Sequence, residues 1–534
     1  MNSQSQQQRA IRAFQEFITT PLETLLQRHI NSKSESAVLT LFHEIAANVP
    51  AYKTFLTQQN INPASIQTFE DFQKLPLITK ENYISRHPLA DLCRNGQLQT
   101  CDMIAASSGS TGKPTFWTRF FTDELQIATR FEQIFHDSFH ADSKSTLAVI
   151  CFTLGTWVGG MFSTNCCRYL ASKGYPLTVI TPGNNKEEIL RIVQELGSAF
   201  EQVVLLGYPP FLKDVIDSGV EWQQYQVKLV MAGEVFSEEW RSLVGERIGS
   251  QNSCYDSASL YGTADAGVLA NETPLSICIR RFLAENPDAA KALFGESRLP
   301  ALLQYDPISR FFEVENGTLF FSGDNGIPLV RYNILDSGGI IRYDAMLEFL
   351  AEWGFNPVTE LENQGVKMNP QPQSYPNQNP QPNPQAGSLG LYEQSPPARA
   401  ILRGIHQLPF VYVFGRSNFT VSYFGANIYP ENVTVGLEQP VIKEWVTGKF
   451  VLQVKEDADK NRFLSVVVEL APEVEGSEEK SEAIANSILS QLKRLNSEFA
   501  NYVPPEYQMP KVILASLGDS EYFPIGVKHR YTRK

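Results

Sequence analysis

The sequence predicts an α/β protein in which a large N-terminal domain, with mostly parallel sheets flanked by helices, precedes a small α+β C-terminal domain. Between residues 145 and 270, short apolar runs alternate with amphipathic stretches, a pattern typical of a parallel sheet with helices on its faces. After residue 415 the pattern changes to a hairpin, a long amphipathic helix and a final apolar run. With 534 residues the chain is also too long for one compact core, so two or more domains are expected.

The elements of the first domain follow from hydrophobic periodicity. Residues 1–90 are expected to be helical, and apolar residues at helical spacing between positions 11 and 18 predict a docked amphipathic helix. Ligands of parallel sheets bind beyond the carboxyl ends of the strands, so the turns at Gly207 and at 232–234 lie on the expected rim. We expect buried strands at 146–152, 177–180, 203–206 and 227–231, with helices at 186–196 and 210–217 between them.

Composition excludes several classes of protein. Hydrophobic residues make up 43% of the chain, which is enough for normal burial and excludes wholesale disorder. A net charge of −13 argues against general affinity for nucleic acids or anionic membranes, although a local basic pocket remains compatible with it. No apolar run approaches the roughly 20 residues that span a bilayer, and the first 30 residues have no apolar signal core. Seven cysteines without a Cys-x-x-Cys pair indicate reduced thiols, so a cytoplasmic protein is expected.

A compositional break lies within the first predicted domain, near its end. Residues 366–399 are rich in Pro, Gln and Asn and offer little to bury, so we expect a disordered or polyproline-like insertion. The insertion is either a tolerated loop or a segment that binds a partner. We place the domains at 1–414, which includes the insertion, and 415–534. The second domain is expected to contain a hairpin at 450–454 and 463–470, a helix at 481–499 and a strand at 511–517.

The most informative stretch is the loop at residues 107–115, which reads Ser-Ser-Gly-Ser-Thr-Gly-Lys-Pro-Thr. Glycines let the backbone turn tightly and aim several N–H groups at one point, hydroxyls add donors, and Lys113 adds a positive charge. The spacing is not that of an ordinary P-loop. The loop is therefore a candidate cradle for the phosphates of a nucleotide, and a mobile surface loop is the alternative.

This loop resembles the phosphate-binding signature of adenylate-forming enzymes, the acyl-CoA synthetase superfamily, and most of all that of the phenylacetate-CoA ligase family. Further segments resemble motifs of that family in the family's own order, over roughly residues 40–530. They are 49–52 with 75–80, 155–160, 232–234, 261–265, 328–332 with Asp336, and 415–417 with 425–430.

The resemblance implies a set of nucleotide-binding residues. An acceptor-only carboxylate suits the ribose hydroxyls, and a permanent cation suits the ribose or the phosphates. The implied residues are Ser107, Ser108, Gly109, Ser110, Thr111, Gly112 and Lys113 around the phosphates, Gly233 and Glu234 beside the adenine, Tyr261 and Gly262 between adenine and acyl-phosphate, and Asp336 with Arg416 near the ribose.

The resemblance also implies a magnesium ligand and three catalytic residues. Asp265 would ligate Mg²⁺ where the family usually has glutamate; the shorter side chain keeps the hard oxygen that magnesium prefers. A capping or surface aspartate is the alternative. The catalytic residues would be Thr263, Arg416 and a lysine of the tail, for which Lys528 is the first candidate and Lys534 the second.

Two further features complete the implied site. Ser417 and Asn418 occupy the position of the hinge about which a mobile C-terminal domain would rotate between half-reactions. Phe152, Trp157, Gly159 and Gly160 would shape an acyl pocket, because an aromatic wall with glycines opposite suits a flat or apolar acid. Ordinary core packing is the alternative for these four residues.

The function implied is ATP-dependent activation of an aromatic or apolar carboxylic acid as an acyl-adenylate, followed by transfer to coenzyme A. ATP, Mg²⁺ and coenzyme A are the expected cofactors. Two alternatives remain open: the same adenylation with transfer to an amine or a carrier protein, and a non-catalytic scaffold that binds nucleotide. A small-molecule acid is the expected partner, with a homodimer or a carrier protein as further options and no nucleic acid.

Overall fold

The computed structural model describes residues 3–107, 115–295, 299–364, 403–416, 420–523 and 531–533. Most of the predicted phosphate loop, all of the predicted insertion, the hinge residues Ser417 and Asn418, and the tail lysines Lys528 and Lys534 lie outside these ranges. Among the described residues, none of the helices combines the length and apolar composition needed to cross a membrane.

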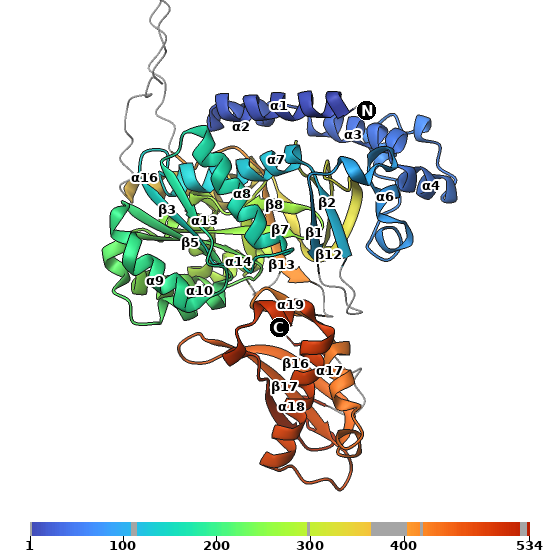
Figure 1. The fold of residues 1–534 in the computed structure, drawn as a ribbon, viewed down its shortest axis with the longest axis vertical. Helices are drawn as coiled ribbons and strands as arrows, with labels where there is room; N and C mark the ends of the chain where they lie inside the picture. The colour runs from blue at the N-terminus through green and yellow to red at the C-terminus, as the bar shows by residue number, and fades with distance from the viewer. Residues whose placement is uncertain are drawn as a thin grey trace, which may run out of the picture.

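The helices α1 to α6 and the hairpin β1–β2 form the N-terminal part of the described chain (Figure 1). Phe17 is buried and the ring of Phe14 lies 5.7 Å from that of Phe121, so the first helix is docked, as its periodicity predicts. The elements are α1 (Ser3–Thr19), α2 (Leu22–Ile30), α3 (Ser34–Asn48), α4 (Pro50–Gln58), α5 (Phe69–Phe72), α6 (Leu89–Leu92), β1 (Met103–Ser107) and β2 (Thr115–Arg119).

An 11-stranded sheet forms the centre of the molecule, in the order β10-β11-β12-β13-β9-β8-β7-β6-β5-β3-β4. The strands β4, β3, β5, β6 and β7 pair in parallel, and the remaining neighbours pair antiparallel. The strands are β3 (Thr146–Ile150), β4 (Leu177–Ile180), β5 (Gln202–Gly207), β6 (Val227–Ala232), β7 (Ser257–Thr263), β8 (Gly267–Asn271), β9 (Ala301–Gln304), β10 (Phe311–Glu315), β11 (Thr318–Gly323), β12 (Leu329–Ile341) and β13 (Phe410–Arg416).

Helices connect and cover these strands, which confirms the predicted α/β class. The apolar runs of β3 and β5 are buried along their whole length, as continuous hydrophobic strands inside a covered parallel sheet should be. The helices are α7 (Phe121–Gln133), α8 (Val158–Lys173), α9 (Lys186–Leu196), α10 (Pro209–Ile216), α11 (Glu238–Ile248), α12 (Ser253–Asp256), α13 (Pro274–Glu285), α14 (Pro287–Phe294), α15 (Tyr343–Glu352) and α16 (Pro357–Asn363).

The elements after residue 420 gather into a smaller body, drawn in orange to red in Figure 1, which we call the C-terminal lobe. Its sheet has the order β16-β17-β18, with β18 parallel to β17. Its elements are β14 (Val421–Tyr423), β15 (Ala426–Ile428), α17 (Pro430–Leu437), β16 (Val446–Glu456), β17 (Arg462–Leu470), α18 (Glu478–Leu495), α19 (Ser497–Tyr502) and β18 (Lys511–Ala515). In Figure 1, α19 lies at the end of this lobe that faces the large sheet.

Candidate active site

The hairpin β1–β2 holds both ends of the predicted phosphate loop. Ser107 ends β1 and pairs with Thr115 at the start of β2. The buried indole of Trp117 donates a hydrogen bond to the Ser107 hydroxyl at 2.9 Å. The Ala106 N–H donates to the Thr156 carbonyl at 3.0 Å, which ties the hairpin to the segment that leads into α8. The loop is thus anchored at its two described ends, and Ser108 to Lys113 lie outside the described residues.

Three of the predicted nucleotide residues come together where β7, β12 and β13 run close to one another. The Tyr261 hydroxyl, from β7, donates a hydrogen bond to the Asp336 carboxylate on β12 at 2.5 Å. Asp336 lies opposite Arg416 in the β12–β13 register and is only 5% exposed. Asp336 is therefore part of a strand and not the residue of a turn.

Asp265 lies in the loop that joins β7 to β8 and is buried. The Tyr332 hydroxyl donates to its carboxylate at 2.5 Å, and the guanidinium of Arg119 donates to the neighbouring carbonyl of Ala264. Magnesium in phosphate-binding sites is held by one or two protein carboxylates together with phosphate oxygens. The donor set at Asp265, one carboxylate in a fixed position, fits that requirement.

Charged side chains next to Asp265 are strongly desolvated. Burial lowers the pKa of Arg119 to about 10, and the carboxylates of Asp123 and Asp265 oppose this shift. Burial, reinforced by the charge of Asp324, raises the pKa of Asp123 to about 7. The cation of Arg119 therefore stays protonated at neutral pH and balances the negative charge of the Asp265 region.

Thr263 and Gly262 shape the turn between β7 and β8. The Thr263 hydroxyl accepts a hydrogen bond from the Ala266 N–H at 3.2 Å. A Cβ on Gly262 would lie 2.8 Å from the Gly267 carbonyl oxygen, so the two strands approach closely only because residue 262 is glycine. The contacts of Thr263 that the structure describes hold this turn in shape.

Glu234 makes its contacts with the C-terminal lobe. One carboxylate oxygen accepts from the Gly425 N–H at 2.7 Å, and the other forms an ion pair with Arg462. The carbonyl of the adjacent Gly233 accepts from the Ser422 hydroxyl at 3.3 Å. In this conformation, the turn after β6 is thus a docking point for the small lobe.

The predicted acyl-pocket residues lie around the start of α8. A Cβ on Gly159 would stand 3.4 Å from the buried Phe152 ring, which places this helix turn against that ring. A Cβ on Gly160 would lie 2.5 Å from the Thr153 carbonyl oxygen, a contact that only glycine avoids. Trp157 precedes the helix and forms an isolated bridge with Ala106 of β1. The structure therefore brings Trp157 beside Ala106, next to the described start of the loop, and packs Gly159 against Phe152.

Ion pairs fix the turn between β16 and β17 to the large lobe. The ammonium of Lys213, whose side chain is 1% exposed, donates to Asn461 at 2.7 Å and to Asp459 at 3.4 Å. Arg247 pairs with both Asp459 and Asp217. Lys213 is buried, but the side chain of Asp459 is 53% exposed and that of Arg247 is 27% exposed, so salt is expected to weaken these contacts. Residues 184–187, Phe211, 500–501, 503–506 and Gln508 line a cavity of about 300 Å³ between the two lobes.

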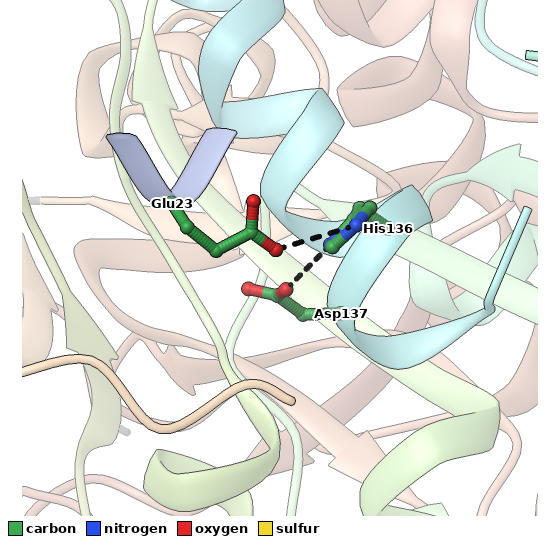
Figure 2. A group of neighbouring side chains, drawn as sticks. All are labelled: Glu23, His136 and Asp137. Atoms are coloured by element: carbon green, nitrogen blue, oxygen red, sulfur yellow. Dashed lines mark hydrogen bonds and ion pairs between the residues drawn. The ribbon is translucent and has the colours of Figure 1, made fainter. Parts of the chain in front are cut away.

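A second charged cluster lies away from these residues, beneath α2 and at the end of α7 (Figure 2). His136 contacts Asp137 through one ring nitrogen at 2.9 Å and Glu23 through the other at 3.4 Å. Arg403 lies 3.2 Å from the second nitrogen and pairs with Asp142 at 2.5 Å. Arg403 brings positive charge to the cluster; burial lowers the pKa of His136, but the hydrogen bond and charge of Asp137 raise it overall. The cluster ties the segment at residue 403 to the main domain.

Sequence reasoning missed three residues of the site. Tyr208 follows β5, Tyr502 ends α19, and Arg462 begins β17. Tyr208 comes directly after a predicted strand at the carboxyl edge of the sheet, so its position was a usable signal. No comparable signal points to Tyr502 or Arg462, because their contacts depend on how the small lobe docks.

Comparisons with known proteins agree with the resemblance. No family model matches the chain. A phenylacetate-coenzyme A ligase of Thermus thermophilus is 21% identical over 322 residues, which is 58% of this chain and 66% of the relative, just under two thirds of its length. A crystal structure of a 2-hydroxyisobutyryl-CoA ligase with 2-HIB-AMP and CoA, in the thioesterification state, superposes with a TM-score of 0.58 at 13% identity, over 97% of this chain and 91% of that chain. This chain therefore has the fold of a CoA ligase, and its resemblance to the adenylate-forming superfamily, near phenylacetate-CoA ligase, is confirmed.

Proposed function

We propose that this protein is an AMP-forming acid–thiol ligase, which activates a carboxylic acid with ATP and transfers the acyl group to coenzyme A. The observation that carries the proposal is the contact of Tyr261 with Asp336, opposite the backbone of Arg416, in a chain whose β1–β2 hairpin anchors both ends of the Ser/Gly loop. A buried carboxylate suits the ribose hydroxyls and a Ser/Gly loop suits the phosphates, so the two features together support nucleotide binding. The CoA-ligase fold supports the same assignment.

In the proposed first step, a carboxylate oxygen of the acid attacks the α-phosphorus of ATP, and the bond to the pyrophosphate oxygen breaks. Both reactants are anions, so the protein has to position them and offset their charge. Ser107 and the loop to Lys113 would hold the outgoing phosphates, Asp336 would accept from the ribose hydroxyls, and Asp265 would hold Mg²⁺, whose charge offsets that of the phosphates.

In the proposed second step, the thiolate sulfur of coenzyme A attacks the carbonyl carbon of the acyl-adenylate, and the bond to the AMP oxygen breaks. The thiol proton passes to solvent, and AMP leaves with the electron pair of the broken bond. We place the boundary between the two domains at residue 415, with Ser417 and Asn418 as the hinge. Rotation there would exchange the residues that the small lobe presents to the site.

We propose an aromatic carboxylic acid as the substrate, with phenylacetate as the simplest example. The support is chemical: the residues beside the phosphate loop are aromatic rings and glycines, which match a flat apolar group. The amine or carrier-protein acceptor remains the second candidate, because the first step is the same for all three acceptors.

Acid-dependent exchange of labelled pyrophosphate into ATP tests the first step. We expect exchange with phenylacetate or a related aromatic acid, dependent on Mg²⁺ and abolished when Thr111 and Lys113 are both replaced by alanine. Subsequent addition of CoA, an amine or a carrier protein, with AMP release as the readout, identifies the acceptor. Lack of exchange with every acid, in protein that still binds ATP, would favour the non-catalytic scaffold instead.

A further inference from the structure

Four aromatic rings form a continuous row across the junction of the two lobes. The ring of Phe152 lies 5.0 Å from that of Tyr208 at 83°, and Tyr208 stacks on Tyr502 at 5.2 Å and 26°. Tyr502 in turn meets Trp157 edge-on, at 5.0 Å and 78°. Three of these rings belong to the large lobe, and Tyr502 comes from α19 of the C-terminal lobe.

Glycines on both lobes position the central ring of the row. A Cβ on Gly233 would stand 3.0 Å from the Tyr208 ring, and a Cβ on Gly425 would stand 2.2 Å from it. Both glycines have positive φ, at 92° and 81°, which other residues adopt at a cost. Tyr208 is therefore held between the turn after β6 and the β14–β15 turn, and the two lobes build one aromatic wall.

One end of this wall lies beside the described start of the phosphate loop, and the proposed acyl group would lie along it. Trp157 is bridged to Ala106, one residue before the phosphate loop begins at Ser107. The Tyr502 ring stands between Trp157 and Tyr208 and is only 8% exposed, so the contact is a packed one. An acyl group directed from the phosphate loop toward Phe152 and Trp157 would meet Tyr502 whenever the lobe is docked.

We propose that Tyr502 is a specificity-determining residue, which the C-terminal lobe contributes as the closing wall of the acyl pocket. The inference rests on the proposed function and extends it. Because Tyr502 moves with the lobe, it would limit acyl size only in the docked conformation. A single aromatic ring on the acyl group would stack against Tyr502, and a fused double ring would force Tyr502 away.

Two adenylate mimics test this without knowledge of the acceptor: 5′-O-(N-phenylacetylsulfamoyl)adenosine and 5′-O-(N-2-naphthylacetylsulfamoyl)adenosine. Their dissociation constants, and that of AMP, are measured by calorimetry on the full chain. In Tyr502→Ala we expect the preference for the phenylacetyl over the naphthylacetyl mimic to fall about tenfold, the low end for a change in a pocket wall. AMP affinity is expected to stay unchanged, because Tyr502 contacts aromatic side chains and not the Asp336 region.

Matched variants distinguish an effect of the Tyr502 ring from a general effect on the C-terminal lobe. Tyr502→Phe keeps the ring and Asn501→Ala changes the exposed neighbouring residue, so both are expected to keep the wild-type preference. If Tyr502→Ala unfolds, Tyr502→Leu keeps much of the volume without the ring and serves in its place. The inference is overturned if the preference does not change, if Asn501→Ala changes it equally, or if AMP affinity falls by the same factor. If the wild-type protein binds neither mimic, the proposed function fails and the inference fails with it.

Discussion

Replacement of Lys528 by alanine is expected to slow acyl-adenylate formation by about 10²-fold or more, the scale for loss of one electrostatic donor at a transition state. Conversion of pre-formed acyl-adenylate by its acceptor is expected to continue at the wild-type rate. The two rates are expected to differ because, in our proposal, Lys528 offsets charge between carboxylate and α-phosphate only in the first step. Pyrophosphate exchange reports the first step, and AMP release from added adenylate reports the second.

The described end of the tail shows how this lysine would be carried. Tyr531 accepts a backbone hydrogen bond from Leu452 at 2.8 Å, and the Arg533 N–H donates to Leu452 at 3.0 Å. Lys528 is thus three residues from an anchored strand edge, within about 10 Å of extended chain. Lys534→Ala is the matched control, because Lys534 directly follows the same anchor. If only Lys534→Ala slows acyl-adenylate formation, Lys534 is the catalytic lysine. If Lys528→Ala slows both steps equally, the proposed rotation of the C-terminal lobe is contradicted.

Asp336→Ala is expected to weaken ATP binding by roughly 10- to 150-fold. The change removes an acceptor of charge-assisted hydrogen bonds, each worth about 1.5–3 kcal/mol, at about 1.4 kcal/mol per tenfold in affinity. Tyr261→Phe is the matched variant, because it removes the hydroxyl that donates to Asp336 and leaves the carboxylate in place. We expect a smaller loss from that change.

Calorimetric titration with ATP, alongside thermal unfolding, separates binding from stability for these variants. Asp336 is buried and paired in β12, so its loss could also lower the midpoint of unfolding. A folded Asp336→Ala protein with wild-type affinity for ATP would place the ribose elsewhere. An affinity loss that Asp336→Asn restores in part would identify hydrogen-bond acceptance as the role of the side chain.

The local hydrophobic pattern was sufficient to predict the strands and helices of the parallel part of the sheet. The run at 177–180 forms β4 over the same residues, and the helix expected at 186–196 forms α9. The antiparallel half was not predicted: β12 pairs with β13 across the segment at 366–399, although β10–β11, β11–β12 and β7–β8 are joined by short turns. The predicted helix at 481–499 is two helices, since Asn496 ends α18 and its side chain caps the Phe499 N–H at the start of α19.

The candidate site divides in the same way. Motif order pointed to Tyr261 and Asp336, and the fold brings their side chains into contact. The partners of Glu234 could not be predicted, because Arg462 and Gly425 reach it only through the docking of the small lobe. A single sequence carries strong signals for strands and for phosphate loops. It carries weak ones for contacts between two lobes that are far apart in the sequence.

Transfer of oxygen from the acid to AMP tests the central claim most directly. Phenylacetate labelled with ¹⁸O in both carboxylate oxygens is incubated with ATP, Mg²⁺, CoA and the full chain, and the AMP is analysed by mass spectrometry. Attack of the carboxylate on the α-phosphorus leaves one acid oxygen on the phosphate when the acyl group departs, so we expect one ¹⁸O in each AMP. If thioester forms and the AMP carries no label, or the label appears in inorganic phosphate, acyl-adenylation is not the reaction of this protein.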